Sequence, residues 1–318
     1  MKQLAGRCAI VTGASRGIGA HIALALAAEG MALVLAARGA ADLKERCLEI
    51  ESAHPSARIL GIPTDVADEA ALRRLVAAAL AEFDAVDLLV NNAGVETFAP
   101  FDLVERSEID AAIRVNLLAP MLLTHQLLPD MLHRRRGHIV NVSSLAGKVG
   151  LACMETYAAT KSGLLGFTQS LRATYAGSGV SASAICPGFV AEGGMYARFT
   201  EDLAHRRNGS QNGSQNGSHN ADADRSRVGP PDAARSGSAA RSPSFQPVPA
   251  AAVARAVVRA IKLDLPEVIV SRRPLRPLLA AAMLSPTLAE RAVERLGLHR
   301  LIRDAARGAR PGDPVRSI

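Results

Sequence analysis

The sequence predicts an α/β fold built on a doubly wound parallel sheet. Short β-branched runs alternate with helical segments, a glycine-rich turn follows the first run, and 48% of the 318 residues are hydrophobic. Runs that are apolar throughout, rather than alternating, are typical of parallel strands buried on both faces. A chain of this length can bury one large core.

The first unit is predicted to be a strand at residues 7–12, a turn, and a helix ending near Glu29. Gly13, Gly17 and Gly19 allow a tight turn and a close approach of the backbone to a ligand. The helix N-terminus behind them presents free N–H groups and a partial positive charge, which suits a phosphate. A tight connection without a ligand is the alternative, but the strand–turn–helix context favours a dinucleotide site.

The second strand, at residues 31–36, ends at Ala37 and Arg38. In such units a carboxylate at the strand end binds the adenosine ribose, whereas an arginine accepts a 2′-phosphate. Arg38 and Arg16 of the glycine turn supply two cations and no acid. We therefore expect a preference for NADP(H), with NAD(H) left open; a solvated loop charge is the alternative for Arg38.

The remaining elements continue the alternation. Strands are predicted over residues 59–62, 87–90, 138–142, 180–185 and 267–271, and helices over 42–52, 68–83, 108–132, 250–263 and from the segment around Tyr157 to about 176. Asp65 either accepts a hydrogen bond from an adenine amine or caps the helix at 68–83. Asn116 is a poor helix former inside the long helix, so it is either a tolerated polar residue or a kink that holds water near Lys161.

The chemistry centres on Ser144, Tyr157 and Lys161. Tyr157 and Lys161 share a helix face, and the strand at 138–142 delivers Ser143 and Ser144 to the sheet edge where such folds bind ligands. A phenol has a pKa near ~10, and an ammonium one turn away is expected to lower it toward neutrality. A serine hydroxyl can hold the substrate oxygen, so these residues predict proton transfer at a carbonyl that exchanges a hydride. An incidental pair on a solvated helix is the alternative for Tyr157 and Lys161 alone.

Six motifs stand together in order along the chain: Thr12–Gly19, Asn91–Gly94, Asn116, Ser144, Tyr157 with Lys161, and Pro187-Gly188. Taken together, they closely resemble the short-chain dehydrogenase/reductase family, whose catalytic domain is Rossmann-type, and the resemblance covers about residues 5–190 and 250–271. The resemblance implies that Tyr157 is the acid/base, that Lys161 lowers its pKa and holds the ribose hydroxyls, that Ser144 polarises the substrate oxygen and that Asn116 supports a proton-relay water.

The resemblance also implies a cofactor site and a substrate site. The implied cofactor residues are Gly13, Ser15, Arg16, Gly17, Ile18, Gly19, Arg38, Asp65, Val66, Asn92, Ala93, Gly94, Tyr157, Lys161, Pro187, Gly188 and Val190. The substrate is expected to contact Ser144, Leu145, Met154, Tyr157 and Phe189, with Val95, Met195 and Tyr196 bordering an apolar pocket. One departure is Glu192, which stands where the family often has a threonine that bonds the nicotinamide carboxamide.

We therefore expect an NADP(H)-dependent oxidoreductase that interconverts a hydrophobic ketone or aldehyde and its alcohol. A 3-oxoacyl thioester reductase and a non-catalytic NADP-binding module are the alternatives. The absence of an Asp-Gly-Gly terminus counts against the first, and the presence of Tyr157 and Lys161 counts against the second. Two copies are expected to pair through the helices carrying Asn116 and Tyr157, giving a dimer or tetramer.

Outside the catalytic domain, expected over residues 1–199 and 250–271, two segments differ in composition. Residues 200–249 are polar and repetitive, which predicts a disordered insertion, either a tolerated surface loop or an extension of the substrate loop. Residues 251–318 contain 13 Lys and Arg against 6 Asp and Glu, which accounts for the whole net charge of +7. The catalytic body is thus neutral and needs no nucleic acid.

The extension at 272–318 reads as basic amphipathic helices, which suit either an anionic membrane surface or docking on protein. Four scattered cysteines without metal spacing and an N-terminus that enters a strand by Arg7 predict a cytoplasmic chain with free thiols, peripheral to a membrane if the extension binds one. No charge-free stretch is long enough to predict a spanning helix.

Overall fold

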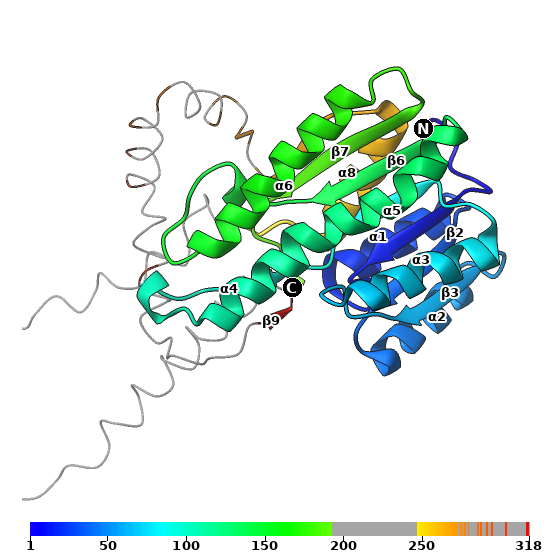
Figure 1. The fold of residues 1–318 in the computed structure, drawn as a ribbon, viewed down its shortest axis with the longest axis horizontal. Coiled ribbons are helices and arrows are strands. Elements are labelled where there is room, and N and C mark those ends of the chain that lie inside the picture. The colour runs from blue at the N-terminus through cyan, green and yellow to red at the C-terminus, as the bar shows by residue number, and fades with distance from the viewer. Residues whose placement is uncertain are drawn as a thin grey trace, which may run out of the picture.

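A computed structural model describes residues 1–192 and 247–272, together with a few separate residues between 274 and 317. Its centre is a 7-stranded sheet in the order β3-β2-β1-β4-β6-β7-β8, with every neighbouring pair parallel (Figure 1). The strands are β1 (Cys8–Thr12), β2 (Ala32–Ala37), β3 (Ile59–Pro63), β4 (Leu88–Asn91), β6 (Gly137–Val142), β7 (Val180–Pro187) and β8 (Glu267–Val270). The strand order reverses between β1 and β4, and ligands bind at the carboxyl ends of the strands beside such a reversal.

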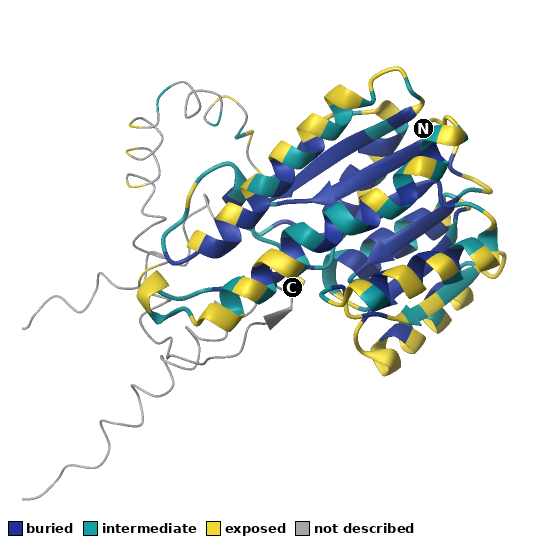
Figure 2. Ribbon diagram, viewed as in Figure 1, coloured by how far each residue is buried: buried dark blue, intermediate teal, exposed yellow. Residues whose placement is uncertain are grey.

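Helices cover both faces of the sheet. They are α1 (Gly17–Ala28), α2 (Ala40–Ala53), α3 (Glu69–Phe83), α4 (Arg106–Ile113), α5 (Ala119–His133), α6 (Glu155–Thr174) and α8 (Ala250–Leu263). Successive residues of a strand point to opposite faces, so Val11 joins a core beneath α1 and α8, whereas Ile10 joins a second core beneath α3 and α5. Figure 2 shows the central strands buried and the helices exposed on their outer faces, whereas the edge strand β3 is partly exposed. The predicted doubly wound α/β fold is confirmed.

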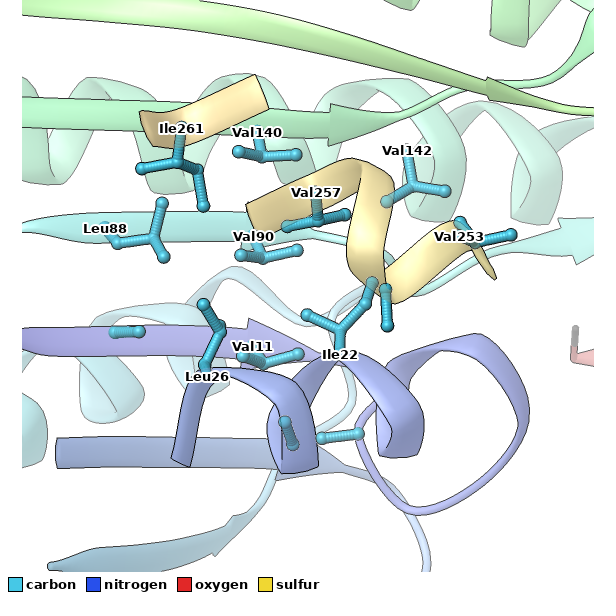
Figure 3. Close-up of a cluster of buried hydrophobic side chains, with 14 of the residues drawn as sticks. Val11, Ile22, Leu26, Leu88, Val90, Val140, Val142, Val253, Val257 and Ile261 are labelled. Atoms are coloured by element: carbon cyan, nitrogen blue, oxygen red, sulfur yellow. The ribbon is translucent and has the colours of Figure 1, made fainter. Parts of the chain in front are cut away.

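Helices α1 and α8 pack against each other although they are far apart in the sequence. Ile22 and Leu26 of α1 meet Val253, Val257 and Ile261 of α8 over the strand residues in one buried cluster (Figure 3). All five side chains are fully buried. Because α1 begins at the glycine turn, this core holds the turn in a fixed position relative to α8.

The long helix predicted over residues 108–132 is present as one continuous helical run, Arg106–His133, which contains a π turn. Helix α4 ends at Ile113, a π-helical turn runs over Arg114–Leu118, and α5 starts at Ala119. Asn116 lies in the π turn, as its poor helix propensity indicated. The predicted strands and the other helices differ from the observed ones by about two residues at their ends.

Some short elements were not predicted. They are β5 (Val95–Glu96), the 3₁₀ turns η1 (Phe101–Leu103) and η3 (Leu145–Gly147), and β9 (Arg316–Ser317). Strand β5 pairs antiparallel with β9, with Val95 opposite Ser317 and Glu96 opposite Arg316. Two-residue strands lack the length that makes alternation readable in a sequence.

The helical run Arg106–His133 is long and apolar enough to cross a membrane, with a mean hydropathy of 1.2 in its most apolar window. Its inner face, however, carries Leu123, Leu127 and Met131 into the core beneath the sheet, and Asn116 is hydrogen-bonded inside the protein. These contacts are those of a core helix. Most of the predicted insertion at 200–249 and extension at 272–318, together with Met195 and Tyr196, lie outside the described residues.

Candidate active site

The glycine turn has a backbone that only glycine can adopt at its key positions. Gly13 and Gly17 have φ angles of +66° and +55°. A Cβ on Gly19 would lie 2.1 Å from the Gly13 carbonyl oxygen, and one on Gly13 would lie 2.9 Å from the Cα of Ala93. No side chain caps the first turn of α1, and no acid lies in it. The turn therefore fits the phosphates of a dinucleotide, held by backbone N–H groups at the helix N-terminus.

The turn after β4 is hydrogen-bonded to the end of β1. The Thr12 hydroxyl oxygen accepts from the backbone N–H groups of Asn92 and Ala93, at 3.0 and 3.1 Å. The Asn92 side-chain amide donates to the carbonyl oxygens of Thr12 and Gly13, at 3.0 and 3.2 Å. Of the predicted residues 92–94, Asn92 and Ala93 thus lie against the glycine turn, where Ser15 and Ile18 are partly buried.

The adenosine end of the predicted site carries exposed cations. Arg16 is the N-cap residue of α1, and Arg38 directly follows β2. The carboxylate of Asp65, also exposed, accepts from the Ala67 N–H at 3.0 Å. Asp65 therefore does not cap α3, because Asp68 occupies that position. Val66, by contrast, is buried in the core beneath α3.

The structure brings Ser144, Tyr157 and Lys161 together at the carboxyl end of β6. The Ser144 hydroxyl lies near the Tyr157 hydroxyl, where it lowers the pKa of Tyr157, and it also accepts from the Ala146 N–H at 3.1 Å. The Lys161 ammonium lies 5.6 Å from the centroid of the Tyr157 ring and donates to the Val142 carbonyl oxygen at 2.9 Å. The Ser143 hydroxyl donates to the Lys161 carbonyl oxygen at 2.9 Å. Tyr157 is 6% exposed and Lys161 is 3% exposed, so both work in a largely water-free setting.

The expected lowering of the Tyr157 pKa by Lys161 is wrong for this structure. Burial raises the pKa of Tyr157, the nearby Glu96 carboxylate raises it further, and the Ser144 hydroxyl offsets this rise only in part. Burial also lowers the pKa of Lys161 from 10.5 to about 8. Removing both groups from water disfavours their charged forms, and this effect outweighs the attraction that their spacing indicated.

Asn116 joins three elements. Its amide oxygen accepts from the Val95 N–H at 2.8 Å, and its amide nitrogen donates to the Val95 carbonyl oxygen at 2.8 Å and to the Thr160 hydroxyl at 3.1 Å. The Thr160 hydroxyl in turn donates to the Tyr157 carbonyl oxygen at 2.8 Å. These bonds hold the π turn, β5 and α6 together. A water relay through Asn116 stays a prediction.

The side where a substrate would lie is mostly apolar. Met154, fully buried, packs with Tyr157, and the partly buried Phe98 and Leu151 complete their cluster. Leu145 lies beside Gly188, whose N–H donates to the Val270 carbonyl oxygen at 2.9 Å. Pro187 ends β7 and is buried, whereas Phe189 and Val190 are partly buried.

Sequence reasoning missed several residues of the site. Glu96, Phe98 and Leu151 lie close to Tyr157, and Thr160 supports Asn116. None of them belongs to a motif, and only their contacts across the fold reveal them.

Comparisons with known proteins agree with this geometry. The family model for short chain dehydrogenases matches residues 7–204. A ketoacyl reductase of Nostoc sp., HetN, is 35% identical over 303 residues, which span 94% of this chain and 92% of that protein.

Two solved structures are also similar. A metagenomic short-chain oxidoreductase in complex with NADP has a TM-score of 0.56 and 40% identity, covering 58% of this chain and 84% of its own. Levodione reductase has a TM-score of 0.69 and 25% identity, covering 84% of this chain and 96% of its own.

Proposed function

This chain belongs to the short-chain dehydrogenase/reductase family and is an oxidoreductase of that family, and from that premise we propose that it uses NADP(H) to interconvert a hydrophobic ketone or aldehyde and its alcohol. The observation that carries the proposal is that Ser144, Tyr157 and Lys161 meet at the same sheet edge as the glycine turn. Proton transfer and dinucleotide binding are thereby available at one place.

The cofactor, when bound, supplies or accepts the hydride. The chain supplies the proton: in reduction, the Tyr157 hydroxyl donates to the oxygen that becomes the alcohol. Ser144 holds that oxygen by hydrogen bonding from its hydroxyl group. Lys161, held by the Val142 carbonyl oxygen, is the buried cation that favours the phenolate left after proton transfer. Burial of Tyr157 and Lys161 keeps water from competing for this proton.

The preference for NADP(H) is supported by Arg16 and Arg38 at the adenosine end, where the end of β2 offers no carboxylate. The similar metagenomic oxidoreductase, solved in complex with NADP, supports the same choice. Apolar side chains at Leu145, Phe98 and Leu151 support a hydrophobic substrate.

A second candidate substrate is a 3-oxoacyl thioester, favoured by the 35% identity to a ketoacyl reductase over nearly the whole chain. Initial rates of NADPH oxidation with neutral cyclic ketones, long-chain aldehydes and acetoacetyl thioesters would separate the two candidates. Activity confined to the thioesters would overturn the hydrophobic ketone assignment.

Replacing Tyr157 tests the chemistry. Tyr157→Phe should lower turnover by about 10²-fold or more, with little change in the Kd for NADPH, because only the proton-donating hydroxyl is removed. Tyr175→Phe, at the far end of α6, is the matched control and should retain activity. Full turnover in Tyr157→Phe would remove Tyr157 from the mechanism.

A further inference from the structure

The chain on either side of residues 193–246 is drawn together by backbone hydrogen bonds. The Val248 N–H donates to the Phe189 carbonyl oxygen at 2.8 Å, and the Ala191 N–H donates to the Val248 carbonyl oxygen at 3.0 Å. Val190 and Val248 form a parallel bridge between them. The side chain of Arg272 donates to the Pro247 carbonyl oxygen at 2.9 Å. Residues 188–192 are thus tied directly to the start of α8.

Glu192 completes this connection. Its carboxylate accepts from the backbone N–H of Ala250, the first residue of α8, at 2.6 Å. Ala250 is fully buried, so its N–H needs a partner inside the protein. The N-cap residue, Pro249, offers no side-chain cap, and the first turn of α8 contains no acid. A carboxylate at a helix N-terminus makes a charge-assisted bond and complements the helix dipole.

The segment that Glu192 ends runs between the two halves of the site. At one end Gly188 lies beside Leu145, the residue after Ser144. At the other end the Glu192 carbonyl oxygen lies 3.6 Å from the position of a Cβ on Gly17, in the glycine turn. Residues 188–192 therefore extend from the residue next to Ser144 to the glycine turn, beside the two places where the proposed dinucleotide would be held.

On the basis of the proposed function, we propose that Glu192 is a positioning residue for the cofactor: by capping α8 it fixes the backbone of residues 188–192 beside the dinucleotide. The carboxylate is thereby turned to α8 instead of the cofactor phosphates, which it would repel. This accounts for an acid at a position where the family often has a threonine. Helix α8 is itself held in place by its packing on α1. The hydrogen bond from Ala250 to Glu192 therefore attaches residues 188–192 to the same core that holds the glycine turn.

The alternative is that Glu192 only stabilises α8, and a cap supplied from within the helix separates the two roles. Pro249 is exposed and has φ −68° and ψ 144°, an extended backbone that suits a serine N-cap. The variants are Glu192→Ala, Glu192→Gln, Pro249→Ser and the double variant Glu192→Ala/Pro249→Ser. For each, the Kd for NADPH is measured by fluorescence titration, Tm by calorimetry without cofactor, and KM and kcat by initial rates.

Glu192→Ala should raise the Kd and KM for NADPH roughly tenfold and lower Tm by a few degrees. The double variant should recover part of the lost Tm, because a serine N-cap accepts from the second or third residue of α8 but not from Ala250, while its Kd stays raised. Pro249→Ser alone should bind NADPH as the wild type does. Glu192→Gln keeps an acceptor and should raise Kd by less than about threefold. Recovery of Kd together with Tm in the double variant, an unchanged Kd in Glu192→Ala, or a Gln variant as weak as the Ala variant would each overturn the proposal. A wild-type chain that binds no NADP(H) would instead overturn the proposed function.

Discussion

The two ends of the central sheet are built differently. At the amino end, Asp87 is buried just before β4 and pairs with Arg134 and Arg136, each at 2.7 Å. At the carboxyl end, Lys161 is equally buried, yet its ammonium donates to a carbonyl oxygen. Fixed ion pairs therefore hold one end, whereas the other end keeps a buried cation and a buried phenol whose charge states can change.

The difference teaches where this fold places stability and where it places chemistry. A paired buried charge is costly to break, which makes it a good clamp and a poor proton carrier. Burial without an opposite charge shifts a pKa, as it does for Tyr157 and Lys161, and residues with shifted pKa values are common in active sites. Variants at the two ends should therefore affect different measurements.

The largest expected effect is at the amino end. Asp87→Ala removes the buried carboxylate that pairs with Arg134 and Arg136 and accepts from the buried Cys8 N–H, and it leaves Arg134 with only the exposed Asp130 as a partner. The free energy of unfolding should fall by about 3–5 kcal/mol, measured by urea denaturation, while kcat per folded molecule should stay within about twofold.

An exposed ion pair provides the control for Asp87→Ala. Arg58 and Glu82 pair at 3.0 Å with side chains 64% and 50% exposed. Glu82→Ala should change the free energy of unfolding by no more than about 1 kcal/mol. A large loss of kcat per folded molecule in Asp87→Ala would show that the amino end of the sheet affects catalysis as well as stability.

The next effect is a pH dependence, also at the amino end. Burial lowers the pKa of His138, at the start of β6, from 6.5 to about 4. Between these values the unfolded chain binds a proton that the folded chain does not, so stability falls as the pH drops from 6.5 to 4, by about 3 kcal/mol. His138→Gln can keep a hydrogen bond to Ser183 but has no titrating side chain, so it should not show this loss of stability at low pH.

Urea denaturation of the wild type and of His138→Gln at pH 7 and pH 4 gives the pH dependence of stability for each protein. The difference between the two is the contribution of His138, because the carboxylates contribute equally to both. Equal pH dependence of wild type and His138→Gln would show that His138 is charged in the folded protein.

The smallest effect concerns the carboxyl end and the choice of cofactor. Arg38→Ala should raise the Kd for NADPH about tenfold, or about 1.4 kcal/mol, and leave the Kd for NADH unchanged, because only NADPH carries the 2′-phosphate. Fluorescence titration with both nucleotides measures the change, with Arg58→Ala as a control for loss of an exposed cation. If the Kd for NADH rose as much as the Kd for NADPH, Arg38 would contribute to nucleotide binding in general and not to recognition of the 2′-phosphate.

The sequence predicted those parts of the site whose signals are local. The backbone of the glycine turn follows from the glycines between a strand and a helix. The shared helix face of Tyr157 and Lys161 follows from their spacing of four residues. The fold class followed from the alternation of apolar runs and helical segments. Even Asn116 marked the irregularity in the long helix, although its π turn was not predicted.

What the sequence could not predict depends on contacts between distant residues. Glu192 meets Ala250 across 58 positions, and Asn116 meets Thr160 across 44. The pKa of Tyr157 was predicted in the wrong direction because spacing reveals a neighbouring charge but not the depth of burial. Desolvation is a property of the whole fold, and no short pattern records it.

The packing of α1 on α8 has a consequence for how the protein is made. A ribosome releases residues 17–28 long before residues 250–263. The apolar face of α1 that packs on α8 therefore stays exposed in the nascent chain until α8 has been synthesised. The entropy of closing so long a loop grows only with the logarithm of its length, by about 0.6 kcal/mol for each doubling. Lengthening or shortening the stretch between β7 and α8 should therefore change the time at which folding finishes far more than the stability of the finished fold.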